Sequence, residues 1–237
     1  MRTSGTREMV SPVTFFFGSR HQERFQLSPE DSHHAVRVLR HGPGDILWCI
    51  DGSGTAFEVL LAEADSRAAQ GTIVREHSRF NEPAAQIELL CGMTQPARMD
   101  WVVEKATELG VHKIYPVLGG QAPGPGRVRR WSRIARGAAK QCCRGVVPQV
   151  FEPAALATQI NLLAPGGLRI RAEVGGGKWP VQEVPPDRMV LAIGRDNGFS
   201  EPEVSLLADS GFTPVDLGPR RLRAETAVVA VLTLVSK

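Results

Sequence analysis

The chain has 237 residues, of which 42% are hydrophobic and 22% charged, a globular composition that excludes an extensively disordered protein. This length is enough for one large domain or two modest ones, each with a buried core. The formal net charge of +3 is too small to indicate a partner, so the positions of the charges carry the information.

The cysteines and the apolar runs narrow the class of protein. Cys49, Cys91, Cys142 and Cys143 show no Cys-x-x-Cys spacing, so neither a zinc site nor a disulfide framework is expected. The apolar run at residues 228–235 is much shorter than the about 20 residues that span a bilayer. Residues 1–11 lack the apolar core of an export signal. We therefore expect a reduced, cytoplasmic protein with no metal and no membrane partner.

Residues 13–78 are predicted to form a small β-barrel that carries one helix, after a loose leader over residues 1–12. The expected strands cover residues 14–17, 45–50, 55–61 and 70–75, with a hairpin turn at 51–54. Ser28 offers an N-cap oxygen and Pro29 suits the first helical position, so a helix is expected from there to Gly42. Arg37 and Arg40 make the surface of this helix cationic.

After a linker at residues 81–84, strands and helices alternate, which predicts a parallel sheet and an α/β domain. The expected strands cover residues 87–91, 113–118, 167–173, 189–193 and 215–217. The expected helices cover residues 98–109, 127–144, 154–163 and 200–211, the last one opened by the capping box Ser200-Glu201-Pro202-Glu203. Residues 119–126 are expected to be a loop rich in glycine and proline.

The helix expected over residues 127–144 carries seven basic residues and no acidic one. At about 100° per residue, its apolar side chains fall on one face with Trp131, and basic side chains line the opposite face. These are Arg129, Arg133, Arg136, Lys140 and Arg144. Many charge runs are only solvated helix faces, but such faces usually alternate signs to form i,i+4 pairs. The missing carboxylates favour an anion-binding surface, for which RNA phosphates are the natural partner.

Two loops that contain glycine, residues 193–199 and 217–226, follow short apolar strands late in the chain. Backbone N–H groups at strand-to-helix turns point outward unpaired, and glycine lets a ligand come close to them. Glu225 and Thr226 stand beside three arginines just before an apolar tail, so these polar groups must satisfy one another or a ligand. The tail must be buried, but its pattern does not distinguish a strand from a helix.

Three other patterns are interpreted as structural. Glu173 and the three glycines after Val174 imitate the turn of a Rossmann methyltransferase, but nearby prolines make the required helix implausible. His33 and His34 diverge on a helix and have no carboxylate partners at i,i+4 spacing, so no metal site is expected. Adjacent Cys142 and Cys143 are interpreted as small residues that fill space in a helix.

Several short motifs follow one another along the chain. Each motif alone is weak evidence for a family, but their order and spacing are specific. The motifs are His33-His34-Ala35-Val36-Arg37-Val38-Leu39-Arg40, Arg98-Met99, Glu104-Lys105-Ala106-Thr107-Glu108-Leu109-Gly110, Arg130-Trp131, Ala138-Ala139-Lys140-Gln141, Ile193-Gly194 with Gly198-Phe199-Ser200, and Leu217-Gly218 with Leu222-Arg223-Ala224-Glu225-Thr226-Ala227. With them the chain resembles the bacterial 16S ribosomal RNA uracil-N3 methyltransferase family, RsmE type, of the knotted SPOUT superfamily. The similarity runs from about Phe16 to the C-terminus.

The resemblance implies a PUA-like RNA-binding β-barrel over residues 1–80 and a SPOUT-type, trefoil-knotted α/β domain over residues 81–237. S-adenosyl-methionine would bind in the knot, and the tail would be a helix packed in a homodimer interface. The residues that the resemblance assigns to the cofactor are Leu191, Ile193, Gly194, Asp196, Asn197, Gly198, Leu217, Gly218, Arg220, Leu222, Thr226 and Ala227.

The resemblance also implies methylation of N3 of a uridine in 16S ribosomal RNA of the small subunit. Because the N3–H is a weak acid, the reaction needs proton removal and stabilisation of the charge that develops on O2 and O4. We expect Arg223 to stabilise that charge, and Glu225 either to orient Arg223 or to take part in proton removal. The expected RNA contacts are Arg37, Arg40, Arg129, Arg133, Arg136, Lys140 and Arg144. The alternatives are a SPOUT enzyme with another rRNA target and a catalytically weak RNA-binding paralogue.

The chain departs from the family pattern in three places. Arg195-Asp196-Asn197 stands where the family has Pro-Glu-Gly, Gly119-Gly120-Gln121-Ala122 where it has Ser-Glu-Arg-Ser, and Gln141-Cys142-Cys143-Arg144 where it has Gln-Ser-Gly-Arg. In the first of these, Asp196 keeps the negative charge and Asn197 can adopt the left-handed conformation that glycine favours. Arg195 replaces a rigid residue and adds positive charge near a sulfonium cofactor.

Overall fold

The computed structural model describes residues 14–93, 95–119, 126–180 and 186–236. The chain divides into two compact units, residues 1–81 with 140–145 and residues 82–139 with 146–237. The segment 140–145 therefore groups with the first unit, although a single boundary after residue 80 places it in the second. The leader expected over residues 1–12 and most of the loop expected over residues 119–126 lie outside the described residues.

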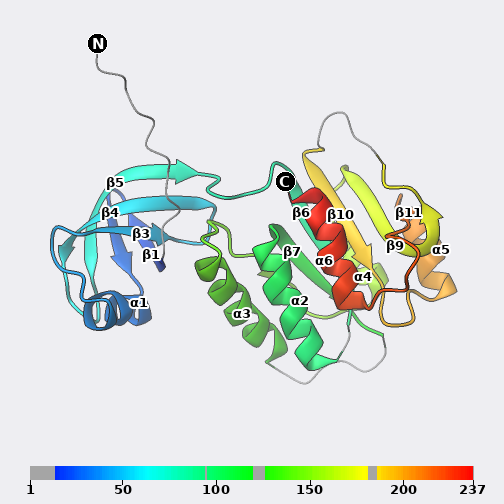
Figure 1. Ribbon diagram of the computed structural model, residues 1–237, viewed down its shortest axis with the longest axis horizontal. Helices are drawn as coiled ribbons and strands as arrows, with labels where there is room; N and C mark the ends of the chain where they lie inside the picture. Colours follow the sequence, from blue (N-terminus) through cyan, green and yellow to red (C-terminus); the bar gives the residue numbers. More distant parts are fainter. Residues whose placement is uncertain (1–13, 94, 120–125, 181–185, 237) are drawn as a thin grey trace, which may run out of the picture. The chain divides into compact units, whose positions relative to one another are not determined.

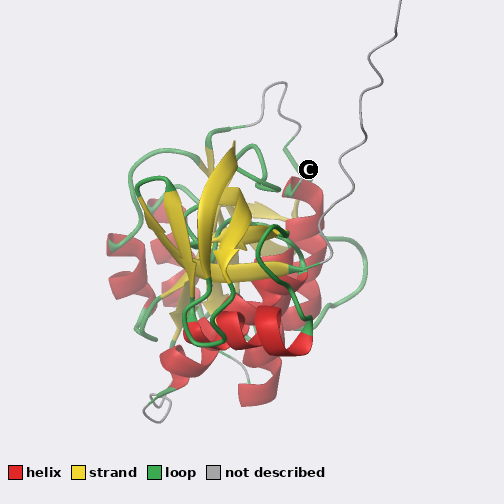
Figure 2. Cartoon of the chain, turned by 90° about the vertical axis from the view of Figure 1, so that its left-hand side faces the viewer, coloured by secondary structure: helices red, strands yellow, loops and turns green. Residues whose placement is uncertain are grey.

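The first unit is a closed barrel with the strand order β1-β2-β5-β4-β3 (Figure 2). Its strands are β1 (Phe15–His21), β2 (Arg24–Leu27), β3 (Ile46–Ile50), β4 (Thr55–Glu63) and β5 (Gln70–Ser78). The expected hairpin joins β3 to β4, with a φ of 89° at Gly52 and 113° at Gly54. Strand β2 is absent from the sequence prediction because its alternation, with Phe25 and Leu27 buried, is too short to indicate a strand.

The helix of the barrel is shorter than expected and changes type along its length. Helix α1 (Pro29–His33) begins after the N-cap Ser28, whose side chain accepts from the Asp31 N–H at 3.2 Å. A π-helical turn, η1 (His34–Val38), follows directly. The buried Asp31 carboxylate accepts from the Phe17 N–H at 2.8 Å, which anchors the helix to β1.

The second unit contains a parallel sheet in the order β11-β9-β10-β6-β7-β8 (Figure 1). Its strands are β6 (Gln86–Gly92), β7 (Val111–Val117), β8 (Gln149–Val150), β9 (Leu168–Gly177), β10 (Arg188–Ile193) and β11 (Thr213–Val215). The predicted α/β class is confirmed, since every neighbouring pair in this sheet is parallel. The carboxyl ends of its strands therefore lie at one edge, where ligands of such sheets bind.

Helices cover both faces of this sheet. One face packs against α2 (Pro96–Glu108), α3 (Arg127–Gln141) and α6 (Ala224–Val235), and the other against α4 (Leu156–Asn161) and α5 (Glu201–Asp209). Because side chains alternate along a strand, Leu89 and Cys91 of β6 enter the first core and Leu90 the second. The capping box of Ser200 and Glu203 opens α5 as predicted.

The apolar tail forms a helix. The buried residues of α6 are Ala224, Ala227, Val228, Val231 and Leu232, which is the spacing of one helical face. Packing of this face against α2 and β10 outweighs the strand preference of the valines. Across the described residues, no helix is long and apolar enough to cross a membrane, and no group of three or more His, Cys, Asp or Glu is placed to hold a metal ion.

Candidate functional site

A cavity of about 390 Å³ lies where β9 and β10 meet the loops that follow β10 and β11. Most of the residues expected to contact a cofactor line it, namely Ile193, Gly194, Asp196, Asn197, Gly198, Leu217, Gly218, Arg220, Leu222 and Ala227. Two expected residues do not belong to its lining, because Leu191 is fully buried in the core and Thr226 is exposed on α6. The volume falls within the range of small-molecule sites, about 300–1,000 Å³.

Residues 171–174 of β9 form one wall of the cavity. The sequence predicted a strand here but did not assign it to the site. The glycines after Glu173 continue β9 to Gly177, so the segment is not the Rossmann turn that it imitates. Arg171 is 5% exposed, and its Nη2 donates to Glu173 Oε2 at 2.6 Å. No local pattern indicates this wall, because β9 reaches the cavity through its parallel pairing with β10.

The two loops at the cavity are tight turns that depend on glycine. A β-carbon on Gly194 would lie 2.6 Å from the carbonyl carbon of Gly198, which itself has a φ of 78°. The left-handed residue of this turn is therefore Gly198 and not Asn197. In the second loop, Gly218 has a φ of 116° and its N–H donates to Asp216 Oδ1 at 2.9 Å. Without side chains at these positions, a ligand can approach the backbone closely.

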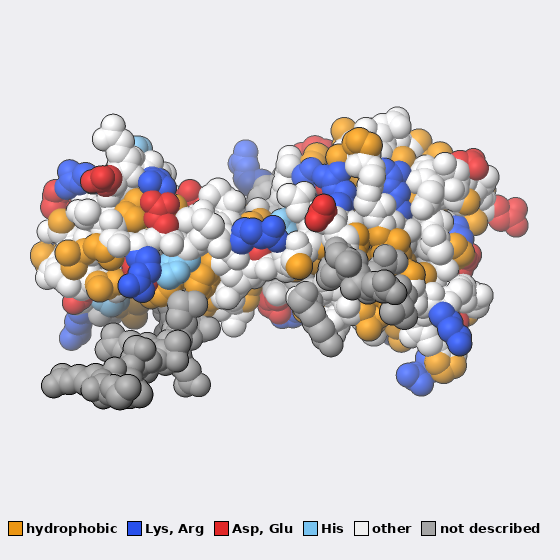
Figure 3. Space-filling view, turned by 90° about the horizontal axis from the view of Figure 1, so that it is seen from above, with side chains coloured by type: hydrophobic (Ala, Val, Ile, Leu, Met, Phe, Trp, Pro, Cys, Tyr) orange, Lys and Arg blue, Asp and Glu red, His pale blue; other side chains and the backbone are white. Residues whose placement is uncertain are grey.

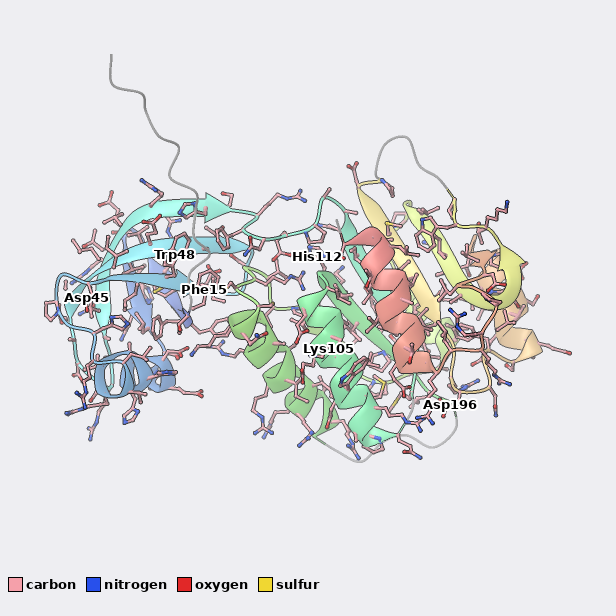
Figure 4. The ribbon with its side chains drawn as sticks, in the orientation of Figure 1. Phe15, Asp45, Trp48, Lys105, His112 and Asp196 are labelled. Atoms are coloured by element: carbon pink, nitrogen blue, oxygen red, sulfur yellow. The ribbon has the colours of Figure 1, made fainter. Side chains whose placement is uncertain are left out.

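Arg98, in the first turn of α2, links the two loops. Its Nη1 lies 3.2 Å from Asp196 Oδ2 in the first loop, and its Nε lies 3.6 Å from Glu225 Oε1 at the start of α6. Arg221 of the second loop donates to the Asp196 carbonyl at 3.1 Å. Figure 4 shows Asp196 beside the N-terminal end of α6. Although Arg98 belongs to a motif of the resemblance, no local spacing connects it with residues 196 and 225.

The two expected catalytic residues lie beside the cavity and not in its lining. Arg223 is the exposed N-cap residue of α6, and within the described residues no hydrogen bond or ion pair holds its side chain. The side chain of Glu225 is 16% exposed. Its Oε2 atom is buried and has no hydrogen-bond partner among the described residues. The charge partner of Glu225 is Arg98, so no contact supports the interpretation that Glu225 orients Arg223.

The Cys91 thiol, whose pKa the Glu225 charge affects, is not a nucleophile. Burial, and then the negative charge of Glu225, raises the pKa of Cys91 to about 12. Cys91 is fully buried at the end of β6 and its Sγ lies 3.6 Å from the carbonyl oxygen of Gly92. The thiol therefore stays protonated at neutral pH and serves packing.

The basic helix of the sequence is α3, and it exposes three of the expected RNA contacts, Arg129, Arg133 and Arg136. On the opposite face, Trp131 is buried and its Nε1 donates to Asp100 of α2 at 3.1 Å. The predicted division of this helix into an apolar and a cationic face is confirmed for these residues. A row of exposed guanidinium groups is suited to phosphate contacts.

For Lys140 and Arg144 the prediction of an exposed cationic face is wrong. Helix α3 ends at Gln141, so Arg144 lies beyond it, and this arginine is 2% exposed. Lys140 is partly buried, pairs with Asp31, and lies 5.5 Å from the centre of the Phe16 ring. Helical periodicity places residues around an axis, but it does not show which of them other parts of the chain cover.

Arg37 and Arg40 are exposed on the barrel. Between them, Val38 is 60% and Leu39 is 43% exposed, so this surface combines apolar and basic side chains and is not uniformly cationic. Figure 3 views the barrel from the side away from α1, where apolar side chains also lie among charged ones. Such a surface suits contacts to both the phosphates and the bases of a nucleic acid.

The fold and the site together define the class of this protein. A cavity formed by glycine turns at the carboxyl edge of a parallel sheet, in a chain that also carries a closed barrel and a basic helix, is typical of an enzyme that acts on nucleic acid. The RNA methyltransferase domain family matches residues 81–236, and the RNA methyltransferase PUA domain matches residues 27–74. The chain belongs to the RNA methyltransferase domain family.

Individual relatives match over nearly the full chain. Ribosomal RNA small subunit methyltransferase E of Bacillus subtilis (strain 168) is 24% identical, and the match covers 90% of this chain and 89% of the relative. The protein of the same name from Synechocystis is 29% identical, with 89% and 72% covered. A crystal structure of ribosomal RNA small subunit methyltransferase E from Neisseria gonorrhoeae, bound to S-adenosyl methionine, has a TM-score of 0.82 at 25% identity and covers 94% of this chain and 96% of that one. These similarities confirm the predicted barrel and α/β fold.

Proposed function

We propose that this chain transfers a methyl group from S-adenosyl-methionine to N3 of a uridine in 16S ribosomal RNA. The observation that carries the proposal is the cavity between the two glycine loops and β9. It is supported by the similarity, across 94% of the chain, to a structure that contains S-adenosyl methionine. The names of the relatives from Bacillus subtilis and Synechocystis support small-subunit RNA as the substrate.

The lining of the cavity suits this cofactor. Ile193, Leu217 and Leu222 offer apolar surface for the adenine ring, and the glycine turns expose backbone groups to its polar atoms. The charged residues at the cavity are largely balanced, since Glu173 pairs with Arg171 and Asp196 with Arg98. A cavity without a large excess of one charge suits a ligand that carries both a carboxylate and cationic groups. When bound, the cofactor supplies an electrophilic methyl group on its sulfonium.

Arg223 and Glu225 lie at the end of α6 next to the cavity, where an RNA base can approach from solvent. The exposed guanidinium of Arg223 is available to stabilise negative charge on O2 or O4 of the uracil. The Oε2 of Glu225 has no hydrogen-bond partner among the described residues, and a turn of this side chain toward the base would let it accept the N3 proton. Because N3 takes part in base pairing, the uridine must be unpaired when it reaches these groups.

Two measurements test the proposal. Calorimetry with S-adenosyl-methionine is expected to show binding by the purified protein. Base-resolved mass spectrometry of rRNA from a deletion strain is expected to show the loss of one N3-methyluridine from 16S rRNA, and its return when the gene is restored. Loss of a different rRNA modification indicates a SPOUT enzyme with another target. No binding heat together with unchanged rRNA indicates an RNA-binding paralogue and refutes the proposal.

RNA binding by α3 is expected to be strongly salt-dependent. Replacing Arg129, Arg133 and Arg136 together by glutamine should flatten the plot of log K against log salt by roughly one unit for each phosphate that the variant no longer neutralises. The measurement is fluorescence anisotropy of a labelled rRNA fragment between low and physiological salt. The matched control is the double variant Arg130→Gln/Asp100→Asn, which removes the ion pair between α3 and α2 without changing the net charge. An equal slope in the triple variant and the wild type makes this face an ordinary solvated surface.

We also propose a homodimer that forms through α6, and a trefoil knot around the cofactor loops, as the resemblance implies. Trp101 of α2 is 40% exposed and Leu234 of α6 is 54% exposed, which leaves large apolar side chains uncovered on two helices that pack together. Light scattering is expected to give twice the mass of the chain, and Leu234→Glu is expected to reduce it to that of one chain. A wild type that is monomeric at micromolar concentration refutes the dimer. The knot has its own test on the backbone path. When the two ends of the path are pulled apart, a knot remains only if the chain is threaded through one of its own loops.

A further inference from the structure

Arg195, one of the residues that depart from the family pattern, is held at the wall of the cavity by two side-chain hydrogen bonds. Its Nη1 donates to the Leu118 carbonyl, at the end of β7, at 3.1 Å. Its Nη2 donates to Glu203 Oε2 in α5 at 2.6 Å. The guanidinium therefore links the loop after β10 to the end of a second strand and to the first turn of a helix. Its positive charge is balanced by Glu203.

Glu203 is itself held in place from a second direction. Its Oε2 accepts from both the N–H and the hydroxyl of Ser200, each at 2.8 Å, which forms the capping box of α5. Burial by itself raises the pKa of Glu203, but the Ser200 hydrogen bonds and the Arg195 charge outweigh it and hold the pKa below its usual value. The carboxylate thus remains ionised at neutral pH, and a charge-assisted hydrogen bond of this kind is among the strong ones in proteins.

The Arg195 side chain occupies the space where Gly119 would carry a side chain. A β-carbon on Gly119 would lie 2.4 Å from Arg195 Cδ and 2.6 Å from its Nη1. A β-carbon on Gly92, at the end of β6, would lie 2.6 Å from the backbone nitrogen of Arg195 and 2.7 Å from its Cγ. The three nearest neighbours of the Gly119 β-carbon are all side-chain atoms of Arg195, whereas the Gly92 β-carbon would meet the loop backbone as well. The arginine therefore fits only because residue 119 is a glycine.

We propose that Arg195 is a positioning residue that holds loop 194–198 in the conformation that receives the cofactor, and that Gly119 is its necessary steric partner. The identity of the cofactor rests on the proposed function. Residues 194–198 all line the cavity, so a loop that is not fixed must be ordered when the ligand binds. Ordering a mobile segment reduces affinity, whereas a loop fixed beforehand avoids this cost. In this chain an ion pair and a backbone contact supply the rigidity that a proline supplies elsewhere in the family.

The test is a double-mutant cycle on Gly119→Ala and Arg195→Ala, with Tm and the Kd of S-adenosyl-methionine as readouts. Arg195→Ala is expected to weaken cofactor binding about tenfold, which corresponds to the loss of one charge-assisted hydrogen bond. Gly119→Ala in the wild-type background should lower Tm by about 3 °C or more, because the β-carbon displaces the arginine. In the Arg195→Ala background the same glycine change should cost almost nothing. Arg195→Lys, which keeps the charge but loses the fork, should recover part of the affinity.

Gly92→Ala is the matched control. Its β-carbon meets the loop backbone as well as Arg195 Cγ, so truncating Arg195 is expected to relieve only part of its cost. If Gly119→Ala does not fold alone, recovery of a folded protein in the double variant confirms the steric pair. Two results overturn the inference: Arg195→Ala binding the cofactor as tightly as the wild type, and equal costs of Gly119→Ala in both backgrounds. A wild-type protein that binds no S-adenosyl-methionine refutes the proposed function instead, while the coupling in Tm stays measurable.

Discussion

Replacing Arg223 by alanine is expected to lower the rate constant for uridine methylation by about 10²–10³-fold, the loss typical of removing one donor to a developing oxyanion. Arg223 is exposed, and no contact within the described residues holds its side chain, so the change removes a charge without disturbing the packing of α6. Tm and the Kd of the cofactor should remain at their wild-type values. The rate is measured as incorporation of labelled methyl groups at saturating cofactor and RNA.

Arg223→Lys separates charge from geometry in this experiment. Lysine retains the positive charge but not the planar fork, so an intermediate rate is expected if the guanidinium contacts a uracil oxygen. An alanine variant that methylates at the wild-type rate, with cofactor binding intact, removes Arg223 from the mechanism. A loss confined to the KM for RNA makes it an RNA contact and not a catalytic residue.

Replacing Glu225 by glutamine is expected to lower the methylation rate about 10²-fold, the contribution typical of a general base. Glu225 Oε2 has no hydrogen-bond partner among the described residues, and it can take the N3 proton once the side chain turns from its buried position toward the base. Without this acceptor, only uridine that has already lost its proton to solvent can react. The rate of the variant should therefore rise with pH toward the range in which free uridine ionises, while the rate of Arg223→Ala should not recover in this way.

Glu201→Gln is the matched control for this experiment. Glu201 also lies in the first turn of a helix, α5, but it is exposed and does not line the cavity. Its substitution removes the same charge from a helix N-terminus and should leave the rate unchanged. If Glu225→Gln slows the reaction but keeps the pH profile of the wild type, Glu225 positions Arg98 and is not the base. A rate equal to that of the wild type excludes both roles.

Local chemistry predicted those parts of the fold that depend on residues close in sequence. The caps at Ser28 and Ser200 and the hairpin between β3 and β4 follow the prediction, because each depends on hydrogen bonds or backbone angles within a few residues. The prediction was wrong for Lys140 and Arg144, where burial depends on distant segments. It also missed β2, because four alternating residues become a strand only when neighbouring strands pair with them.

The site also has features that local sequence predicts and features that depend on distant residues. The glycine loops could be predicted because Gly194, Gly198 and Gly218 indicate turns by themselves. The β9 wall and the Arg98 bridge could not, since Arg98 and Asp196 are 98 residues apart in the chain. Local patterns contain no information about such pairs. The sequence alone indicates that Arg195 adds positive charge near the cofactor. In the folded chain Glu203 balances this charge, and Gly119 leaves space for the side chain.

Local patterns were enough to predict the alternation of strands and helices, the two glycine turns and the basic face of α3, because periodicity, capping and turn geometry act over one or two turns of chain. The helical form of the tail and the pairing of charges around the cavity follow from packing in the folded chain. The tail from Ala224 to Val235 is apolar throughout most of its length, so its helical period appears only when one face is buried. Burial and ion pairing act between residues that folding brings together, and their energies therefore depend on the whole fold.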